Sequence, residues 1–154
     1  MTKSTMKIAT KRFGTLEVDE DKVLFFPEGI FAFEQYHKYV LLTVKEKTEF
    51  YWLQSLEDND LAFLVVNTAL HVPDYVPVVE KEFLNVLETD DISQTECWLI
   101  ITVPPGKPAE MTANLQGPLL INPKNRKGAQ FVSANDKHIV RAPFLEILQK
   151  GIGS

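Results

Sequence analysis

The chain has 154 residues, a formal net charge of −5 and 45% hydrophobic residues; this length fits one domain, which buries roughly 70% of the surface of the unfolded chain. The negative charge opposes a nucleic-acid-binding role, because such proteins neutralise phosphates with Lys and Arg. The single cysteine, Cys97, excludes both an internal disulfide and a zinc site built from cysteines.

The N-terminal part of the chain predicts a meander of strands. Residues 1–5 are polar, and we expect them to be disordered ahead of a single folded domain over residues 6–149. A weak alternation predicts a strand at 6–10, and two more strands are predicted at 13–18 and at the apolar residues 23–26. Residues 19–22 are expected to form a hairpin turn. The aromatic-rich residues 30–39 show neither the helical nor the strand period of apolar residues, and they predict a loop.

The middle of the chain predicts a hairpin, a buried strand and one helix. Residues 39–44 and 50–56 are strand candidates on either side of a charged turn, and the apolar run 61–66 is expected to be buried on both faces. A long irregular loop follows, of a kind that often carries function. Pro77 suits the first turn of a helix that we place at about 77–88 from its apolar spacing.

The stretch from 112 to 128 is the one around which the rest is organised. Leu115, Leu119 and Ile121 are an even number of residues apart, so they would lie on one face of a strand. Gly117-Pro118 interrupts the backbone hydrogen bonding and divides the stretch into two strands. Asn122-Pro123 and Asn125-Arg126-Lys127-Gly128 then predict a tight turn, and an extended segment follows at 130–132. Residues 97–103 predict a second apolar strand. Residues 144–148 are expected to form a short C-terminal helical turn before residues 150–154 fray.

These elements predict a mainly β fold, namely a compact antiparallel barrel-like roll with one substantial helix and a short C-terminal helical turn. Regular strand–helix alternation, the pattern of doubly wound folds, does not occur in the chain. No stretch approaches the ~20 apolar residues that a membrane span needs, and no secretory signal precedes the domain, so we expect neither membrane nor secretion but the cytoplasm.

The residue types that carry catalysis do not form a recognisable motif. The three histidines (His37, His71 and His138) lie far apart in the sequence, with no nucleophile motif beside them and no metal-ligand spacing. His71 with Asp74 is the best enzymatic candidate, although such a pair is most often a surface turn. Cys97 lies in an apolar run and is interpreted as packing. We therefore expect no metal, no cofactor and no small-molecule substrate.

Charged clusters offer two ways to bind a partner. Lys124, Arg126 and Lys127 with exposed aromatics would fit a small RNA-binding β-barrel module, the alternative function, although such a turn is usually just solvated. Carboxylates gather instead at three element ends, and one of these groups is Glu57, Asp58 and Asp60. A negative surface steers a basic partner and raises its association rate.

Four segments together resemble the bacterial flagellar assembly factor FliW family. They are TANLQGPLLINPKNRKGAQ (112–130), FPEGIFAFE (26–34), LQSLEDNDLAF (53–63) and VPDY (72–75). The resemblance implies a small barrel-like β fold, no catalysis and no direct nucleic-acid contact. It also implies two cytoplasmic partners: flagellin, and the carbon storage regulator CsrA, a small basic dimer that represses translation of flagellin mRNA. Partner exchange would relieve that repression.

Two departures from the family pattern accompany this resemblance. Phe31-Ala32-Phe33 lacks the Pro-Gly pair of that loop, and Asn67-Thr68 stands where Asp-Pro is common. The pattern leaves open whether the two partners compete directly or through a conformational change, as well as the oligomeric state.

Two groups of residues are candidate contacts. Glu57, Asp58 and Asp60 are expected to face the regulator, and replacing all three with Ser should slow its association and flatten the salt dependence. For the 114–122 strand the hypothesis is a groove for an amphipathic flagellin helix, and the alternative, which the sequence supports at least as well, is that its aliphatic side chains pack in the core. Full burial of its four aliphatic side chains would exclude the groove. The strand residues concerned are Asn114, Leu115, Gln116, Leu119, Leu120, Ile121 and Asn122.

Overall fold

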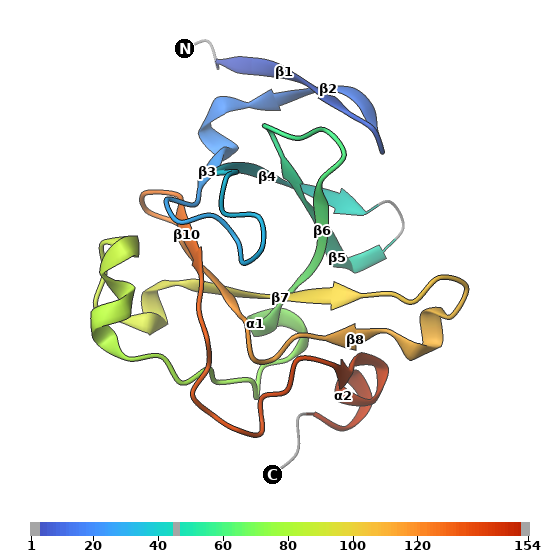
Figure 1. Ribbon diagram of the computed structural model, residues 1–154, viewed down its shortest axis with the longest axis vertical. Helices are drawn as coiled ribbons and strands as arrows, with labels where there is room; N and C mark the ends of the chain where they lie inside the picture. The colour runs from blue at the N-terminus through green and yellow to red at the C-terminus, as the bar shows by residue number, and fades with distance from the viewer. Residues whose placement is uncertain (1–3, 45–46, 152–154) are drawn as a thin grey trace.

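The computed structural model describes residues 4–44 and 47–151, and seven of the strands within them close into a barrel (Figure 1). The ring closes where β9 returns to pair with β7, matching Trp98 with Leu119. Every pairing around it is antiparallel except the short parallel contact of β3 with β10. The predicted antiparallel barrel is therefore confirmed. In ring order the strands are β7 (Glu96–Thr102), β6 (Ala62–Asn67), β5 (Lys47–Ser55), β4 (Lys38–Val44), β3 (Leu24–Phe25), β10 (Lys127–Gln130) and β9 (Leu119–Asn122).

A two-stranded sheet lies outside the barrel at the N-terminal end of the chain. β1 (Thr5–Thr10) pairs with β2 (Gly14–Asp19), and its apolar side chains pack on Val40 of β4. The predicted hairpin turn at 19–22 is wrong. The chain forms a short 3-10 helix there, η1 (Glu20–Lys22), because the Asp19 carboxylate accepts a hydrogen bond from the backbone N–H of Asp21. β2 is thus separated from β3, which pairs with β4 and β10 instead.

The strand β6 alternates between two apolar clusters. Val65 points into the barrel interior, whereas Val66 joins a second cluster outside it, and both are fully buried. The four residues at 61–64 are only partly buried. The prediction of a strand buried on both faces is therefore right for its C-terminal end alone, since successive strand residues face opposite sides and only that end is covered twice.

The stretch 112–128 contributes to each of these clusters. Leu119 and Ile121 face the barrel interior beside Trp98, while Leu115 joins the second cluster. Two short strands extend the sheet beyond β7 there, β8 (Thr112–Ala113) and β11 (Ala142–Pro143). The C-terminal helix α2 (Phe144–Lys150) follows directly and buries Phe144 and Ile147. The predicted C-terminal helical turn is confirmed, and α2 includes Lys150, where fraying had been expected.

The helix predicted at about 77–88 is shorter and of another type. The structure has a 3-10 helix, η2 (Lys81–Leu87), which buries Leu84 and Leu87 against β10. The helix does not begin at Pro77, because the backbone of the next residue is hydrogen-bonded to another segment. The N–H of Val78 donates to Ser133 Oγ, and the carbonyl of Val78 accepts from the N–H of Ala134. The remaining short helices are α1 (Thr68–His71), η3 (Ile92–Gln94) and η4 (Pro108–Glu110).

The structure locates the start of the ordered chain and the second departure from the family pattern, Asn67-Thr68. Thr5 belongs to β1, so the ordered chain begins before residue 6, while residues 1–3 and 152–154 lie outside the described part. Asn67, at the second departure from the family pattern, caps α1 by accepting a hydrogen bond from the N–H of Ala69. The long loop thus contains a helix that its prolines did not predict.

The first departure from the family pattern lies in the loop at 29–34, where it places an alanine in a backbone conformation that favours glycine. Ala32 has φ +75°, in the left-handed region that favours glycine. Replacing Ala32 with Gly should raise the free energy of unfolding by about 1 kcal/mol, because the strain of this φ would be relieved. Urea unfolding checks this, with Ala134→Gly, at a loop position without a positive φ, as a control that should not stabilise. A loss of stability in Ala32→Gly would contradict the strain argument.

Candidate protein-binding surface

The acidic turn, residues 57–60, joins β5 to β6 and is fixed by hydrogen bonds. One carboxylate oxygen of Glu57 accepts from the backbone N–H groups of His37 and Lys38, at 2.5 and 2.9 Å. Partial burial acts to raise the pKa of Glu57, but these two hydrogen bonds, together with the charges of His37 and Lys38, outweigh it and leave that pKa below its ordinary value. Glu57 therefore anchors the start of β4 and is not simply a surface charge.

The rest of the turn is held from within. Ser55 Oγ accepts from the N–H groups of Glu57 and Asp58, and the Asp58 carboxylate accepts from the N–H of Asp60 at 3.0 Å. The side chain of Gln54, which is 1% exposed, donates to the carbonyl of Leu61. Such a network positions carboxylates with little conformational freedom, which lowers the entropic cost of binding.

The outer carboxylates of the turn remain available to a partner. Asp60 is exposed, and its carboxylate forms no hydrogen bond or ion pair with any residue in the described ranges. Lys11 lies beside the turn, where its N–H donates to the carbonyl of Asn59 at 3.0 Å. Arg12 is engaged with the ring of Trp52, its guanidinium carbon 4.1 Å from the ring centroid. The turn thus presents acidic groups next to a basic hairpin end.

The groove predicted on the 114–122 strand is not there. Leu115, Leu119, Leu120 and Ile121 are at most 3% exposed, so all four are core residues of the closed barrel and its neighbouring clusters. Its polar side chains hydrogen-bond to the backbone: Asn114 Oδ1 accepts from the N–H groups of Gln116 and Gly117, and the side-chain amide of Asn122 donates to the carbonyl of Leu87. Only Gln116 of the whole set is exposed.

The basic turn at 124–127 is largely neutralised, which removes support for RNA binding. Lys127 Nζ lies 2.5 Å from a carboxylate oxygen of Glu88, and this contact lowers the pKa of Glu88. Arg126 donates to the carbonyl of Asp21 at 2.8 Å and lies near its carboxylate. A nucleic-acid site requires cations free to meet phosphates, and two of these three side chains are engaged within the chain.

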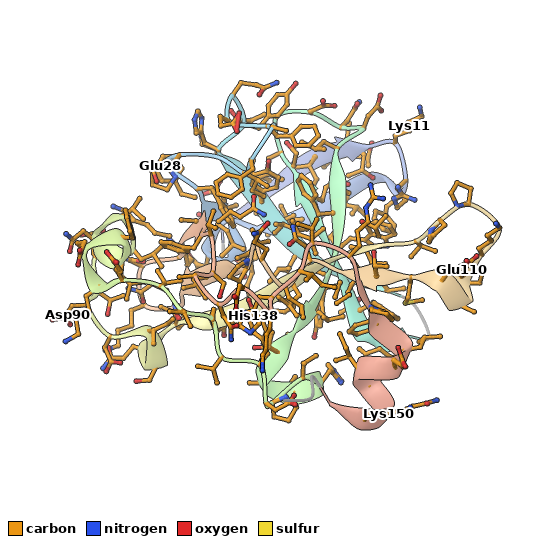
Figure 2. All side chains as sticks on the ribbon, turned by 60° about the horizontal axis from the view of Figure 1, so that its bottom comes forward. Lys11, Glu28, Asp90, Glu110, His138 and Lys150 are labelled. Atoms are coloured by element: carbon orange, nitrogen blue, oxygen red, sulfur yellow. The ribbon has the colours of Figure 1, made fainter. Side chains whose placement is uncertain are left out.

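The structure contains a buried Ser–His pair that the sequence reasoning missed, and its histidine, His138, is labelled near the middle of Figure 2. Ser133 Oγ and His138 Nδ1 are 2.7 Å apart, and both residues are at most 5% exposed. The His138 ring packs on Tyr75 with centroids 4.7 Å apart. Because Ser133 also accepts from the N–H of Val78, the pair ties the 133–138 segment to residues 75–78. The sequence feature that could have indicated this pair is a Ser and a His five residues apart in a loop.

Burial lowers the pKa of His138, which predicts a pH-dependent stability. The unfolded imidazole takes up a proton below its ordinary pKa of about 6.5, whereas the folded ring resists protonation. The free energy of unfolding should therefore fall as pH drops from about 7 towards the lowered pKa of the folded state. Urea unfolding across this range checks it. His138→Asn should flatten the curve, and an equally steep curve in that variant would contradict the assignment.

Other candidate chemistry is structural in character. Burial raises the pKa of the Cys97 thiol to about 12, so this side chain is protonated at neutral pH and packs, as predicted. His71 ends the short helix α1, half-buried. Within residues 4–44 and 47–151, no three His, Cys, Asp or Glu side chains are grouped to hold a metal ion. None of the helices in those ranges is long and apolar enough to cross a membrane.

Comparison with known proteins gives one consistent family. The FliW protein family profile matches residues 7–145. The flagellar assembly factor FliW of Leptospira interrogans serovar Lai is 41% identical over 96% of this chain and 99% of its own length. That of Caldanaerobacter subterraneus subsp. tengcongensis is 37% identical over 94% and 96%. A crystal structure of the flagellar assembly factor FliW superposes with a TM-score of 0.79 at 29% identity, covering 90% of this chain and 96% of the other.

Proposed function

The chain belongs to the FliW family of flagellar assembly factors, and from this premise we propose that it is a cytoplasmic, non-catalytic protein that binds flagellin and the translational regulator CsrA in exchange. Flagellin that has not been exported occupies the factor and leaves the regulator free to repress flagellin mRNA. Export of flagellin releases the factor, which then binds the regulator and relieves the repression.

The observation that carries this proposal is the acidic turn at 57–60. The N–H groups of His37 and Lys38 donate to Glu57, and Ser55 Oγ accepts from the N–H of Glu57, so the turn is held in one conformation with the Asp60 carboxylate exposed. A fixed cluster of negative charge on a chain of net charge −5 suits a small basic partner, because complementary potentials accelerate encounter and suppress wrong partners. The regulator is such a partner, and its RNA-binding surface is basic by necessity.

Three groups that could suggest catalysis have structural roles instead. Ser133 and His138 are buried, and Ser133 Oγ already accepts the N–H of Val78. The Cys97 thiol is protonated at neutral pH. A nucleophile must be reachable and activated, so these groups support packing and loop anchoring.

An electrophoretic mobility experiment with flagellin leader RNA tests the proposal. The purified protein alone should not shift the RNA, but it should abolish the shift caused by the regulator. Adding purified flagellin should restore that shift, because flagellin withdraws the factor. A shift by the protein alone would favour the RNA-binding alternative, and an unchanged regulator–RNA complex at saturating factor would reject the proposed function.

A further inference from the structure

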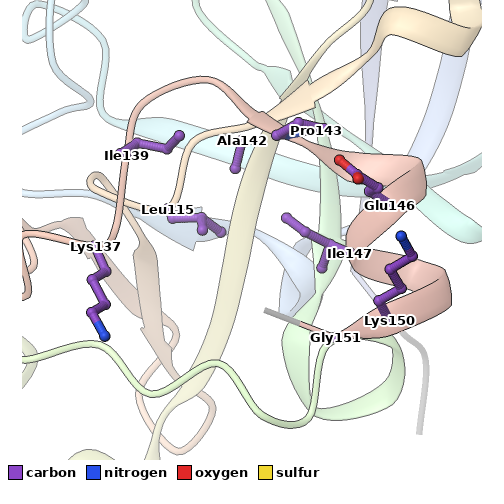
Figure 3. A pocket seen from close by; sticks show the side chains of 9 residues that line it. All are labelled: Leu115, Lys137, Ile139, Ala142, Pro143, Glu146, Ile147, Lys150 and Gly151. Carbon is purple, nitrogen blue, oxygen red and sulfur yellow. The ribbon is translucent and has the colours of Figure 1, made fainter. Parts of the chain in front are cut away.

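A pocket of about 340 Å³ lies at the C-terminal side of the molecule, between the 137–143 segment and α2 (Figure 3). Its floor is apolar: Leu115, Ala142 and Ile147, members of the second core cluster, line it from three elements. Ile139, which is 50% exposed, and Pro143 continue this surface outward. The volume is at the small end of ligand pockets, about 300 to 1,000 Å³, and suits one or two bulky side chains.

The rim of the pocket is positively charged on two sides. Lys137 and Lys150 stand apart at its edges in Figure 3, and Glu146, one helical turn before Lys150, is the acidic residue among the lining side chains. Neither ammonium group forms an ion pair with another residue of the described ranges. Two unpaired cations beside an apolar hollow are unexpected on a chain of net charge −5, and they define the chemistry of an occupant.

We propose that this pocket is a docking site for an apolar, acidic peptide segment of a protein partner, one that places a bulky aliphatic side chain on Leu115 and Ile147 and carboxylates near Lys137 and Lys150. Removing aliphatic surface from water supplies affinity, and the two cations select the charge and direction of the segment. A free phosphate fits less well, because the floor lacks donors and Glu146 repels an anion of high charge.

This site is chemically opposite to the acidic turn and lies elsewhere on the molecule. The acidic turn sits beside the β1–β2 hairpin at the top of Figure 1, whereas α2 lies at the lower right. A basic regulator is therefore not the occupant. The inference rests on the proposed function, in which a second protein partner exists, and it assigns to flagellin the apolar and acidic segment.

The test measures binding of two probes to the full chain. The first is the fluorescein-labelled peptide acetyl-ELLEELLEELL-amide, with a counterpart in which every Glu is Lys, and the second is monomeric flagellin. The wild-type chain should bind the acidic peptide about tenfold tighter than the basic one in low salt. The double variant Lys137→Glu, Lys150→Glu should lose about tenfold in affinity for both the acidic peptide and flagellin, and Ile139→Asp should lose a comparable factor.

Matched variants separate this site from general charge and apolar surface. Lys124→Glu makes the same kind of charge change on the β9–β10 turn, and Phe83→Asp removes an aromatic side chain that is 61% exposed on η2. Both should bind as the wild type does. If wild type binds flagellin but the pocket variants bind it equally well, or if wild type prefers the basic peptide, the docking site is wrong. If wild type does not bind flagellin at all, the proposed function itself fails.

Discussion

Replacing Gly128 with Ala should lower the free energy of unfolding by about 2 to 3 kcal/mol, the upper part of the range for an overpacked core. A Cβ at this position would lie 2.6 Å from Cζ of Phe26 and within 2.9 Å of two further ring atoms. Phe26 is fully buried in the barrel interior, where its ring packs edge-on against Tyr39 at 5.3 Å. The ring has little room to move, so β10 and β3 would have to separate. Urea unfolding measures the loss.

Two further variants test whether the Phe26 ring is the cause. Gly14→Ala is the control, because its Cβ would meet nothing within 4 Å and only the positive φ of the hairpin opposes it, which should cost about 1 kcal/mol. In the Phe26→Leu background, Gly128→Ala should cost much less than in the wild type, as expected for residues in contact. Equal losses in the two backgrounds would mean that the backbone of β10, rather than the ring, requires glycine.

The role of Gly128 could be predicted only in part from the sequence. Its neighbours Asn125, Arg126 and Lys127 predicted a tight turn, and the structure has one there, with Arg126 at φ +61°. The pattern assigned Gly128 itself to the turn, although it lies in β10 opposite Ile121. The reason for the glycine is a ring about one hundred positions earlier in the chain. Contacts across such separations carry no local signal, so the pattern cannot reveal them.

The strands and the helices were predictable to different degrees. Period-two alternation located the strands well, because each strand of the barrel has one face towards an apolar cluster. Closure itself depends on β9 meeting both β10 and β7, which no local pattern encodes. At 77–88 the apolar spacing favoured an α-helix, but the hydrogen bonds between Val78 and the 133–134 segment delay the helix until Lys81. Tertiary contacts thus overrode a local preference.

The candidate site, too, was only partly predictable from the sequence. The carboxylates at 57–60 were visible as a cluster, but their separate roles were not, because the hydrogen bonds from His37 and Lys38 come from a different strand. The aliphatic residues of the 114–122 strand were correctly seen as too many for one face. They are nevertheless all buried, since β9 lies between the barrel interior and η2 and so has apolar neighbours on both sides.

The different roles of the acidic side chains predict a large effect on the rate of association with the regulator. Replacing Asp58 and Asp60 together with Asn should slow association with the basic regulator about fivefold at low ionic strength, because steering weakens with each charge removed. The amide oxygen of an asparagine at position 58 would still accept the hydrogen bond from the N–H of residue 60, so the turn should keep its shape. Stopped-flow association over a salt series measures this, and the rate should depend less steeply on salt than that of the wild type.

Glu57→Gln provides the contrasting variant. It removes one negative charge from the same turn, where the double variant removes two, but it also weakens two charge-assisted hydrogen bonds that hold the start of β4. We expect it to lower the free energy of unfolding by about 1 kcal/mol, whereas the double Asn variant should unfold like the wild type. Because the pKa of Glu57 is lowered in the folded chain, this stabilisation is present above its unfolded pKa of about 4.5 and is lost as pH falls through the lower, folded value. A double Asn variant that associates at the wild-type rate at every salt concentration would remove the acidic turn from the regulator-binding surface.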